Sequence, residues 1–252
     1  MIFTNLIKTN LRTKSLGKDI EYYQRLDSTN DESWNLIKDG SASHGMIVIT
    51  DNQIKGKGRN NNNWHMSPSK GLAMSIILQK NLKVSEAKLI PLAAGIAAAQ
   101  AIENRGGSPT LKWPNDIFIN EKKIGGILCE SKISSGSIKE MVVGIGINVN
   151  ENSRDFPEEI VKGATSLYIE TGYSHQRELI CAIYTTFFER LLDQLPSTTS
   201  MWSNYCDNIG KLISFNFNNK KRKGIFKGIN EDGRARLLID EKIKLFDSIV
   251  LD

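Results

Sequence analysis

Residues 110–130 read Thr-Leu-Lys-Trp-Pro-Asn-Asp-Ile-Phe-Ile-Asn-Glu-Lys-Lys-Ile-Gly-Gly-Ile-Leu-Cys-Glu, and this stretch decides the fold. Apolar and β-branched residues fill 110–113, 117–120 and 124–130. Asn120-Glu121-Lys122 has the composition of a hairpin turn between the last two runs. Runs this short and this close together predict neighbouring strands in an antiparallel part of a sheet.

Further strand-like runs lie on both sides of this stretch, at 20–26, 46–50, 72–78 and 138–149. Three helical stretches alternate with them. The first follows the cap-forming residues 27–30 and ends at Lys38, and the second is the Ala-rich stretch 86–104. The third covers 175–195, with Ser174 as its expected N-cap and one apolar face formed by Leu179, Ile183, Phe187 and Leu191.

The character of the chain changes after Pro196. Four short β-like segments occupy 212–217, 224–229, 235–239 and 243–245, separated by polar turns. This spacing predicts a small antiparallel barrel. We therefore expect an α+β protein with a large domain over residues 1–205 and a small β domain over 206–252.

Composition limits the classes of function. The 252 residues carry 33 Lys and Arg against 28 Asp and Glu, a net charge of +5. This mild excess suits anionic ligands such as nucleotides and falls short of what nucleic-acid binding requires. Cys129, Cys181 and Cys206 are too few and too widely spaced for a disulfide framework or a zinc site. With no signal peptide and no membrane span expected, the prediction is a soluble cytoplasmic protein.

The segment Gly56-Lys57-Gly58-Arg59 alternates glycines with cations inside a long polar stretch, residues 51–70. Glycine permits close backbone approach to a ligand, and the cations can bind phosphate or carboxylate oxygens. The pattern does not match a P-loop. A solvated loop explains it equally well, so alone the segment indicates little.

Lys112-Trp113-Pro114-Asn115-Asp116 places polar groups at a strand end. Asp116 is a candidate ligand for the Mg²⁺ carried by a nucleotide, with a turn cap as the alternative. Lys123 stands just before Gly125-Gly126 and can supply a point charge to a developing phosphoryl transition state.

Gly144-Ile-Gly146-Ile-Asn148 repeats the glycine pattern on another strand, so the two glycine pairs predict a pocket floor of bare backbone. A bulge or twist is the alternative for each pair. His44, His65 and His175 lie too far apart in sequence to indicate a metal site.

Taken in order, these motifs resemble the biotin protein ligase family. The resemblance rests on Ser28-Thr29-Asn30 after a strand, the glycine and cation loop ending in Trp64, 112–116, Lys123 with its glycines, and 144–148. It is strong over about residues 20–150 and looser toward the C-terminus, where the family carries a small SH3-like barrel. The family forms biotinyl-5′-AMP from biotin and MgATP, and then transfers biotin to a lysine of a biotin carboxyl-carrier protein, an acetyl-CoA carboxylase subunit.

The resemblance also implies roles for residues. Lys123, Arg59 and Lys112 would be catalytic. Biotin would be bound by a set drawn from five parts of the chain: Ser28, Thr29, Asn30, Gln53, Gly56, Lys57, Gly58, Arg59, Ser75, Lys123, Gly126, Leu128 and Gly144. ATP would be bound by Lys57, Arg59, Trp64, Lys112, Asn115, Asp116 and Asn148, with Asp116 on Mg²⁺. No tightly bound cofactor is expected.

The sequence departs from the family pattern in two places. Lys57 stands where the family usually has arginine, and Asn60 to Asn63 replace the rest of its loop. Lysine keeps the charge and loses the two-pronged geometry of arginine. In addition, only about 20 residues precede the first strand, too few for the DNA-binding domain of some members, so no nucleic-acid partner is expected.

Three alternatives stay open at this point. A lipoate or octanoate ligase of the same fold would adenylate a different carboxylic acid. A non-enzymatic biotin or nucleotide sensor would not need the set of cations. A nucleic-acid binder using Lys220 to Lys223 would lack a recognition motif. Sheet-edge dimers occur in the family, so a homodimer is a candidate assembly.

Overall fold

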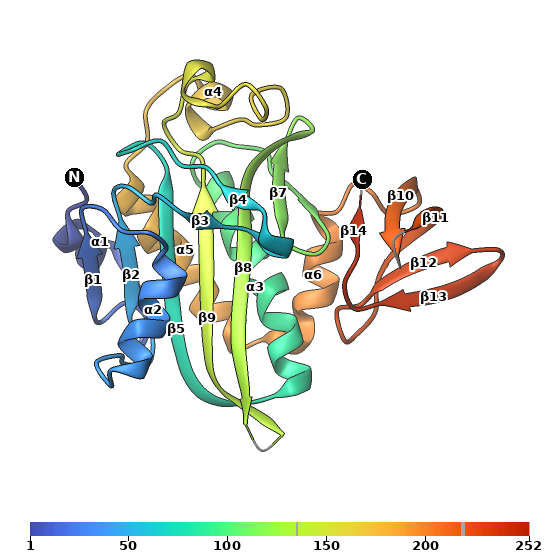
Figure 1. Cartoon of the computed structure of the whole chain (residues 1–252), viewed down its shortest axis with the longest axis horizontal. Helices are drawn as coiled ribbons and strands as arrows, with labels where there is room; N and C mark the ends of the chain where they lie inside the picture. The colour runs from blue at the N-terminus through green and yellow to red at the C-terminus, as the bar shows by residue number, and fades with distance from the viewer. Residues whose placement is uncertain (135, 218–219, 252) are drawn as a thin grey trace.

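The computed structural model describes residues 1–252 except 135, 218–219 and 252. The described residues form a seven-stranded mixed sheet in the order β1-β2-β5-β9-β8-β7-β6 (Figure 1). Only β1 and β2 are parallel, and the other neighbours are antiparallel. The strands are β1 (Ile20–Tyr23), β2 (Ile47–Thr50), β5 (Leu72–Lys83), β6 (Thr110–Lys112), β7 (Asp116–Ile119), β8 (Lys122–Ser134) and β9 (Ser137–Ile147). The α+β prediction and the hairpin at 120–122 are confirmed.

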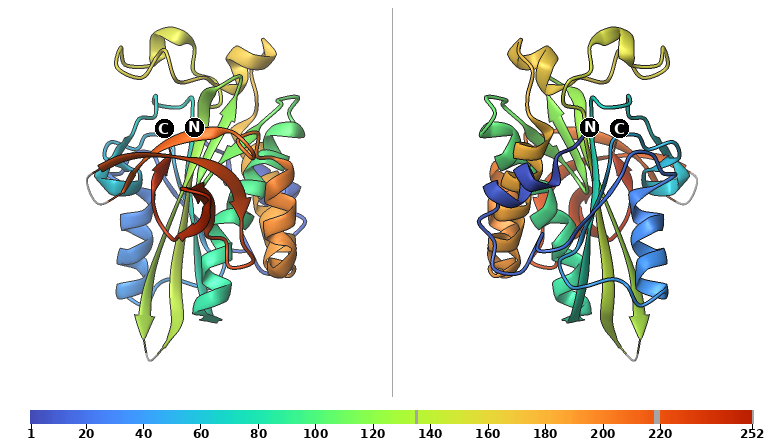
Figure 2. Two further views of the ribbon diagram at one scale, coloured as in Figure 1. Left: turned by 90° about the vertical axis from the view of Figure 1, so that its right-hand side faces the viewer. Right: turned by 90° about the vertical axis from the view of Figure 1, so that its left-hand side faces the viewer.

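Helices cover both faces of this sheet (Figure 2). One face carries α2 (Thr29–Lys38), which Ser28 caps by accepting a hydrogen bond from the Asp31 amide. The other carries α3 (Val84–Glu103), α5 (Arg177–Leu192) and α6 (Thr198–Asn204). The thirteen buried residues of α3, most of them alanines, let it pack closely on the sheet. No helix in the described part of the chain is long and apolar enough to cross a membrane.

One prediction about a helix is wrong. The helix α5 begins at Arg177 with Gln176 at its N-cap, not after Ser174. The reason is that the backbone N–H and C=O of His175 are both bound by the side chain of Asn150, which holds this segment outside the helix. The deeply buried face of α5 carries Ile180, Tyr184, Phe188 and Leu191, while Leu179, Ile183 and Phe187 are half-buried.

The first nineteen residues also contain an element that the sequence did not predict, the helix α1 (Thr4–Asn10). It packs against α5, and Ile7 is buried there. The helix has only seven residues and no capping side chain, which explains why the sequence pattern did not predict it.

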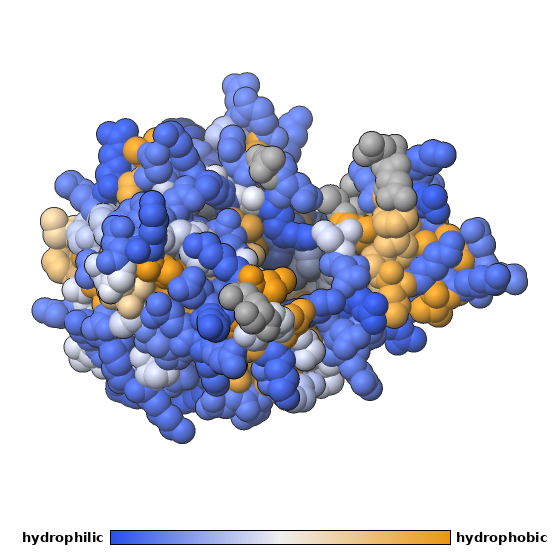
Figure 3. All heavy atoms as spheres, turned by 60° about the horizontal axis from the view of Figure 1, so that its bottom comes forward, coloured by the Kyte–Doolittle hydropathy of each residue, from blue (hydrophilic) through white to orange (hydrophobic). Residues whose placement is uncertain are grey.

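The C-terminal strands form a separate antiparallel sheet in the order β13-β12-β11-β10-β14. They are β10 (Leu212–Phe217), β11 (Lys220–Ile229), β12 (Ala235–Ile239), β13 (Lys242–Phe246) and β14 (Val250–Leu251). Phe215 and Phe217 each pack edge-on against Phe246 inside it. Apolar residues also gather on the surface of this unit (Figure 3), where Leu212, Ile243 and Leu245 are exposed. The predicted small β unit is confirmed.

The polar stretch 51–70 folds into a small hairpin that crosses in front of the main sheet (Figure 1). It consists of β3 (Gly56–Lys57), the 3-10 turn η1 (Arg59–Asn61) and β4 (Asn63–Trp64). Three other short elements complete the chain: η2 (Ser153–Asp155), α4 (Leu167–Thr171) and η3 (Leu195–Ser197).

Candidate active site

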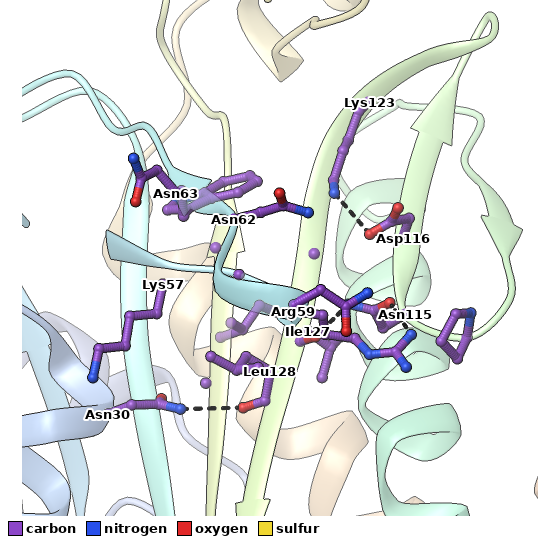
Figure 4. Close-up of a pocket in the computed structure, with 18 of the residues that line it drawn as sticks. Asn30, Lys57, Arg59, Asn62, Asn63, Asn115, Asp116, Lys123, Ile127 and Leu128 are labelled. Carbon is purple, nitrogen blue, oxygen red and sulfur yellow. Dashed lines mark hydrogen bonds and ion pairs between the residues drawn. The ribbon is translucent and has the colours of Figure 1, made fainter. Parts of the chain in front are cut away.

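A cavity lies between the hairpin β3–β4, the start of α2 and the strands β7, β8 and β9 (Figure 4). It brings together fifteen of the eighteen residues that the resemblance implied. They come from every part of the chain between α2 and β9: Ser28, Thr29, Asn30, Gln53, Lys57, Gly58, Arg59, Trp64, Lys112, Asn115, Asp116, Lys123, Gly126, Leu128 and Gly144. The remaining three, Gly56, Ser75 and Asn148, do not line it.

One wall of the cavity is built from uncharged polar groups. The N-cap Ser28 and the first helical residues Thr29 and Asn30 present it, because an N-cap leaves side chains and amide N–H groups at the helix start. Gln53 follows β2, and its Oε1 accepts a hydrogen bond from the Thr29 N–H at 2.8 Å and lies 3.2 Å from Thr29 Oγ1. All four residues are buried.

Ser75 lies behind this wall and is fully buried in β5. Its Oγ is 2.7 Å from Thr29 Oγ1 and 2.7 Å from Asn30 Oδ1. Ser75 is therefore separated from the cavity by these neighbours.

The glycines of β9 do not form the bare floor that the sequence predicted. A Cβ on Gly144 would lie 2.2 Å from Asn30 Oδ1, and one on Gly146 would lie 2.4 Å from the indole of Trp64. A side chain from another element therefore packs directly against the backbone of each glycine. Gly126 on β8 is different, since a Cβ there would meet nothing closer than 3.6 Å.

The charged end of the cavity centres on Lys123 and Asp116, whose side chains form an ion pair at 2.7 Å (Figure 4). In the sheet, the backbone of Asp116 lies opposite Lys112 on β6 and opposite Gly126 on β8, and this strand register places its side chain at the cavity. Asn115 is held by a hydrogen bond from its Nδ2 to the Ile127 carbonyl at 2.7 Å. Among the described residues that line the cavity, Asp116 is the only carboxylate.

The other cations point in different directions. Arg59 donates to Asn115 Oδ1 at 3.3 Å and to Ser248 Oγ at 2.8 Å, which links the hairpin to the segment between β13 and β14. Burial lowers the pKa of its guanidinium, and the nearby Asp116 acts in the opposite direction. Lys57 is half exposed, and its ammonium pairs with Asp31 on α2. Lys112 lies 5.7 Å from the ring centre of Phe118.

A second cavity adjoins the first at Trp64. Lys123, Asn63 and Trp64 line both cavities. The second cavity also holds Gly56 and Asn148, two of the residues that are absent from the first. Its other lining residues are ones for which the sequence predicted no ligand-binding role: Ile54, Lys55, His65, Pro157, Glu159, Ile160, Gly163 and Ala164. Segment 150–164 carries few apolar residues and no recognisable motif, so no pattern in it pointed to a ligand.

Two loops on this side are tied together by Asp155. Its carboxylate accepts from Lys70 Nζ at 2.6 Å, and its backbone carbonyl accepts from Ser67 Oγ at 3.1 Å and lies 3.1 Å from His65 Nε2. Burial acts to raise the pKa of Asp155, but the hydrogen bonds from Lys70 and the Asn152 amide lower it overall. The hairpin loop and the segment after β9 therefore form one continuous rim.

The base of the hairpin loop is held by a buried ion pair. Arg177 on α5 donates to Asp51 Oδ1 at 2.6 Å and to the Gly71 carbonyl at 3.2 Å. Asp51 begins the loop and Gly71 ends it, so one guanidinium fixes both ends. Burial acts to raise the pKa of Asp51, but Tyr22 and Arg177 bind its carboxylate and lower the pKa overall.

No group of three or more metal-binding side chains occurs in the described residues. A single carboxylate with a neighbouring amide, as at Asp116 and Asn115, fits Mg²⁺ that arrives with a nucleotide and takes its other ligands from phosphates and water.

Comparison with known proteins gives consistent matches. The model of the biotin/lipoate A/B protein ligase family matches residues 22–148. The bifunctional ligase/repressor BirA of Bacillus subtilis is 33% identical over 244 residues, covering 94% of this chain and 75% of that protein. The biotin–[acetyl-CoA-carboxylase] ligase of Paracoccus denitrificans is 29% identical, covering 83% and 90%. The structure of biotin protein ligase from Aquifex aeolicus in complex with biotin and ATP matches with a TM-score of 0.79 at 29% identity, covering 93% and 99%.

Proposed function

The chain belongs to the biotin/lipoate A/B protein ligase family, and we propose that it is a biotin protein ligase. It activates biotin with MgATP to biotinyl-5′-AMP and transfers the biotinyl group to a lysine of a biotin-carrier protein. The observation that carries this proposal is the position of Lys123, which lines two adjoining cavities at once. A reaction between two anionic substrates requires such a cation where they meet.

Biotin occupies the first cavity in this proposal. Its uncharged ring system lies against the polar wall of Ser28, Thr29, Asn30 and Gln53, and its carboxylate points toward Lys123. The adenosine of ATP occupies the second cavity, between Trp64 and the apolar residues Pro157 and Ile160. The α-phosphate then lies beside Lys123, because that residue is shared by both cavities.

The first step joins the two substrates. A biotin carboxylate oxygen attacks the α-phosphorus, the bond from that phosphorus to the bridging oxygen of the β-phosphate breaks, and pyrophosphate leaves. Lys123 neutralises the charge that gathers on the α-phosphate oxygens, and Asp116 holds its ammonium in place beforehand. Arg59 and Lys112 add positive charge at the edges of the cavity, and Asp116 and Asn115 bind the Mg²⁺ of the nucleotide.

The second step transfers the product. The amine of the acceptor lysine attacks the carbonyl carbon of the mixed anhydride, the carbon–oxygen bond to phosphate breaks, AMP leaves and the amine loses a proton to solvent. Trp64 and the hairpin cover the junction of the cavities and keep water from the anhydride before the acceptor arrives.

We further propose that the acceptor is the carboxyl-carrier subunit of acetyl-CoA carboxylase, in keeping with the name of the Paracoccus denitrificans relative. A homodimer through the sheet edge is a second proposal. It is supported by β8, whose pairing with β7 ends at Gly126 although the strand continues to Ser134. Sedimentation velocity would test this assembly. A cytoplasmic location is supported by the three cysteines, none of which forms a disulfide.

The experiment that tests the central proposal is biotin-dependent exchange of labelled pyrophosphate into ATP, with lipoate and octanoate measured alongside. Exchange with biotin alone supports the proposal. Exchange with lipoate or octanoate in place of biotin would show a ligase of the alternative class. No exchange with any acid, from folded protein, would favour a sensor. Transfer of labelled biotin to a purified carrier domain tests the second step.

A further inference from the structure

Glu130 stands outside the cavity, yet it is bonded to the wall that faces the ligand. It lies on β8, and its Oε2 accepts from Asn30 Nδ2 at 2.7 Å and from Trp34 Nε1 at 3.4 Å. The second N–H of the Asn30 amide points to the Leu128 carbonyl at 3.3 Å (Figure 4). Both of these acceptors are oxygens that cannot donate, so the Asn30 amide has only one satisfactory orientation.

That orientation has a consequence for Ser75. With its nitrogen turned toward Glu130, Asn30 presents Oδ1 to the Ser75 hydroxyl at 2.7 Å. An amide oxygen can only accept, so Ser75 must donate its single proton to it. Ser75 Oγ is then an acceptor toward Thr29 Oγ1, which lies 2.7 Å away. The Thr29 hydroxyl proton therefore points at Ser75 and not into the cavity.

The last link faces the ligand. Because the Thr29 proton is used by Ser75, the free lone pairs of Thr29 Oγ1 remain available to the cavity. Gln53 Oε1 accepts the Thr29 amide N–H at 2.8 Å. Thr29 Oγ1 lies 3.2 Å from the same oxygen, but its single proton is directed at Ser75, so the second lone pair of Gln53 Oε1 stays free. The wall thus offers hydrogen-bond acceptors, and it is complementary to a head group that carries N–H donors.

We propose that Glu130 is a specificity-determining positioning residue: through Asn30, Ser75 and Thr29 it fixes the direction of the hydrogen bonds so that the wall accepts from a cyclic urea. This rests on the proposed function and explains how the site distinguishes biotin, whose ureido ring has two N–H groups, from lipoate, whose dithiolane ring has none. With the amide of Asn30 reversed, each proton in the chain would reverse and the wall would donate instead.

The test is Glu130→Gln, which keeps the size of the side chain and adds an amide that can donate as well as accept. Pyrophosphate exchange is measured with biotin and with its carbocyclic analogue, in which both ureido N–H groups are CH₂. Wild-type protein should prefer biotin by a factor on the order of 10⁴, as expected when buried acceptors are left unpaired. In Glu130→Gln we expect this preference to fall about tenfold, mainly through a higher KM for biotin, with kcat and the KM for ATP changed less than about twofold.

Two further variants separate this role from a structural one. Ser75→Ala breaks the same chain behind the wall, and it should lose preference by a similar factor even if Glu130→Gln folds poorly. The double variant should be no worse than the more impaired single variant, because both act on one chain of bonds. Glu32→Gln makes the same chemical change on α2, where Glu32 accepts from the Tyr23 hydroxyl, and should leave the preference unchanged.

The outcomes are distinct. A fall in activity toward biotin and the analogue by the same factor in both variants would overturn the inference, as would an unchanged preference. Wild-type protein that exchanges pyrophosphate with no biotin dependence would instead refute the proposed function and say nothing against the geometry of Glu130.

Discussion

Replacement of Gly146 by alanine tests whether Trp64 is the shared wall of the two cavities. Gly146 lies on β9 opposite Gly126, and the indole of Trp64 rests directly on it. An added Cβ would lie 2.4 Å from Cε2, 2.5 Å from Nε1 and 2.7 Å from Cζ2 of that ring. The backbone itself accepts alanine, because Gly146 is not among the residues with positive φ.

The size of the effect follows from these distances. Ordinary van der Waals contact begins at 3.4 Å, so a distance of 2.4 Å requires the indole to move by about 1 Å. Overpacking of this kind costs about 1–3 kcal/mol. Trp64 belongs to a hairpin with two residue pairs, outside the main core, so the hairpin yields before the sheet does. At about 1.4 kcal/mol per tenfold, the cost corresponds to a rise of about five- to 150-fold in the KM values for biotin and ATP.

Pyrophosphate exchange at varied biotin and ATP concentrations measures this rise, and a thermal melt checks the fold. The matched control is Gly95→Ala in α3, where a Cβ would meet only Leu111 at an ordinary 3.8 Å. That variant should keep both KM values and gain about 0.5–1 kcal/mol of stability from helix propensity. If Gly146→Ala kept both KM values within twofold of wild type, Trp64 would not rest on Gly146 in the working enzyme, and the shared wall would be refuted.

Three further predictions concern charge. Lys123→Ala should abolish pyrophosphate exchange while the circular dichroism spectrum stays unchanged, because the side chains of its ion pair with Asp116 are 37% and 31% exposed and such a pair contributes little to stability. Exchange at the wild-type rate would remove Lys123 from its proposed role. Arg177→Met should lower the free energy of unfolding in urea by about 3–5 kcal/mol, since it removes the buried partner of the Asp51 carboxylate. A loss below about 1 kcal/mol would contradict this. Burial raises the pKa of Glu151 from 4.5 to about 7, so the stability linked to its protonated form is complete below pH 4.5 and is lost as the pH rises through 7. The urea concentration at the unfolding midpoint should therefore be lower at pH 8 than at pH 5. Glu151→Gln should remove most of this difference.

Local signals in the sequence were enough for most of the fold. The hairpin at 120–122, the N-cap at Ser28 and the four segments after Pro196 each carry their own turn or cap chemistry, and each was predicted close to its observed place. The start of α5 was not, because the groups that hold His175 outside the helix belong to Asn150, twenty-five residues earlier. A contact of that kind leaves no mark in the neighbouring sequence. The division of the chain at residues 205 and 206 stays a prediction.

The same distinction between local signals and distant contacts applies to the candidate site. Residue types and spacing pointed to Lys123, Asp116 and the polar wall, because their chemistry is visible in the residues themselves. The sequence did not predict the contacts between distant elements. Asn30 and Trp64 pack on Gly144 and Gly146, Ser75 lies behind the wall, and a second cavity forms beside the segment after β9. These relations are set by strand register and helix packing, which depend on the whole fold.

The bond between Arg59 and Ser248 spans 189 positions and has a meaning for synthesis of the protein. Translation at about 5–20 residues per second lets the early strands, α2 and the hairpin emerge well before residue 248 exists. Until then Arg59 lacks one of its two hydrogen-bond partners, and Ile249 is absent from the rim of the first cavity. A growing chain on the ribosome therefore carries an incomplete binding cavity until residues 248 and 249 have been translated.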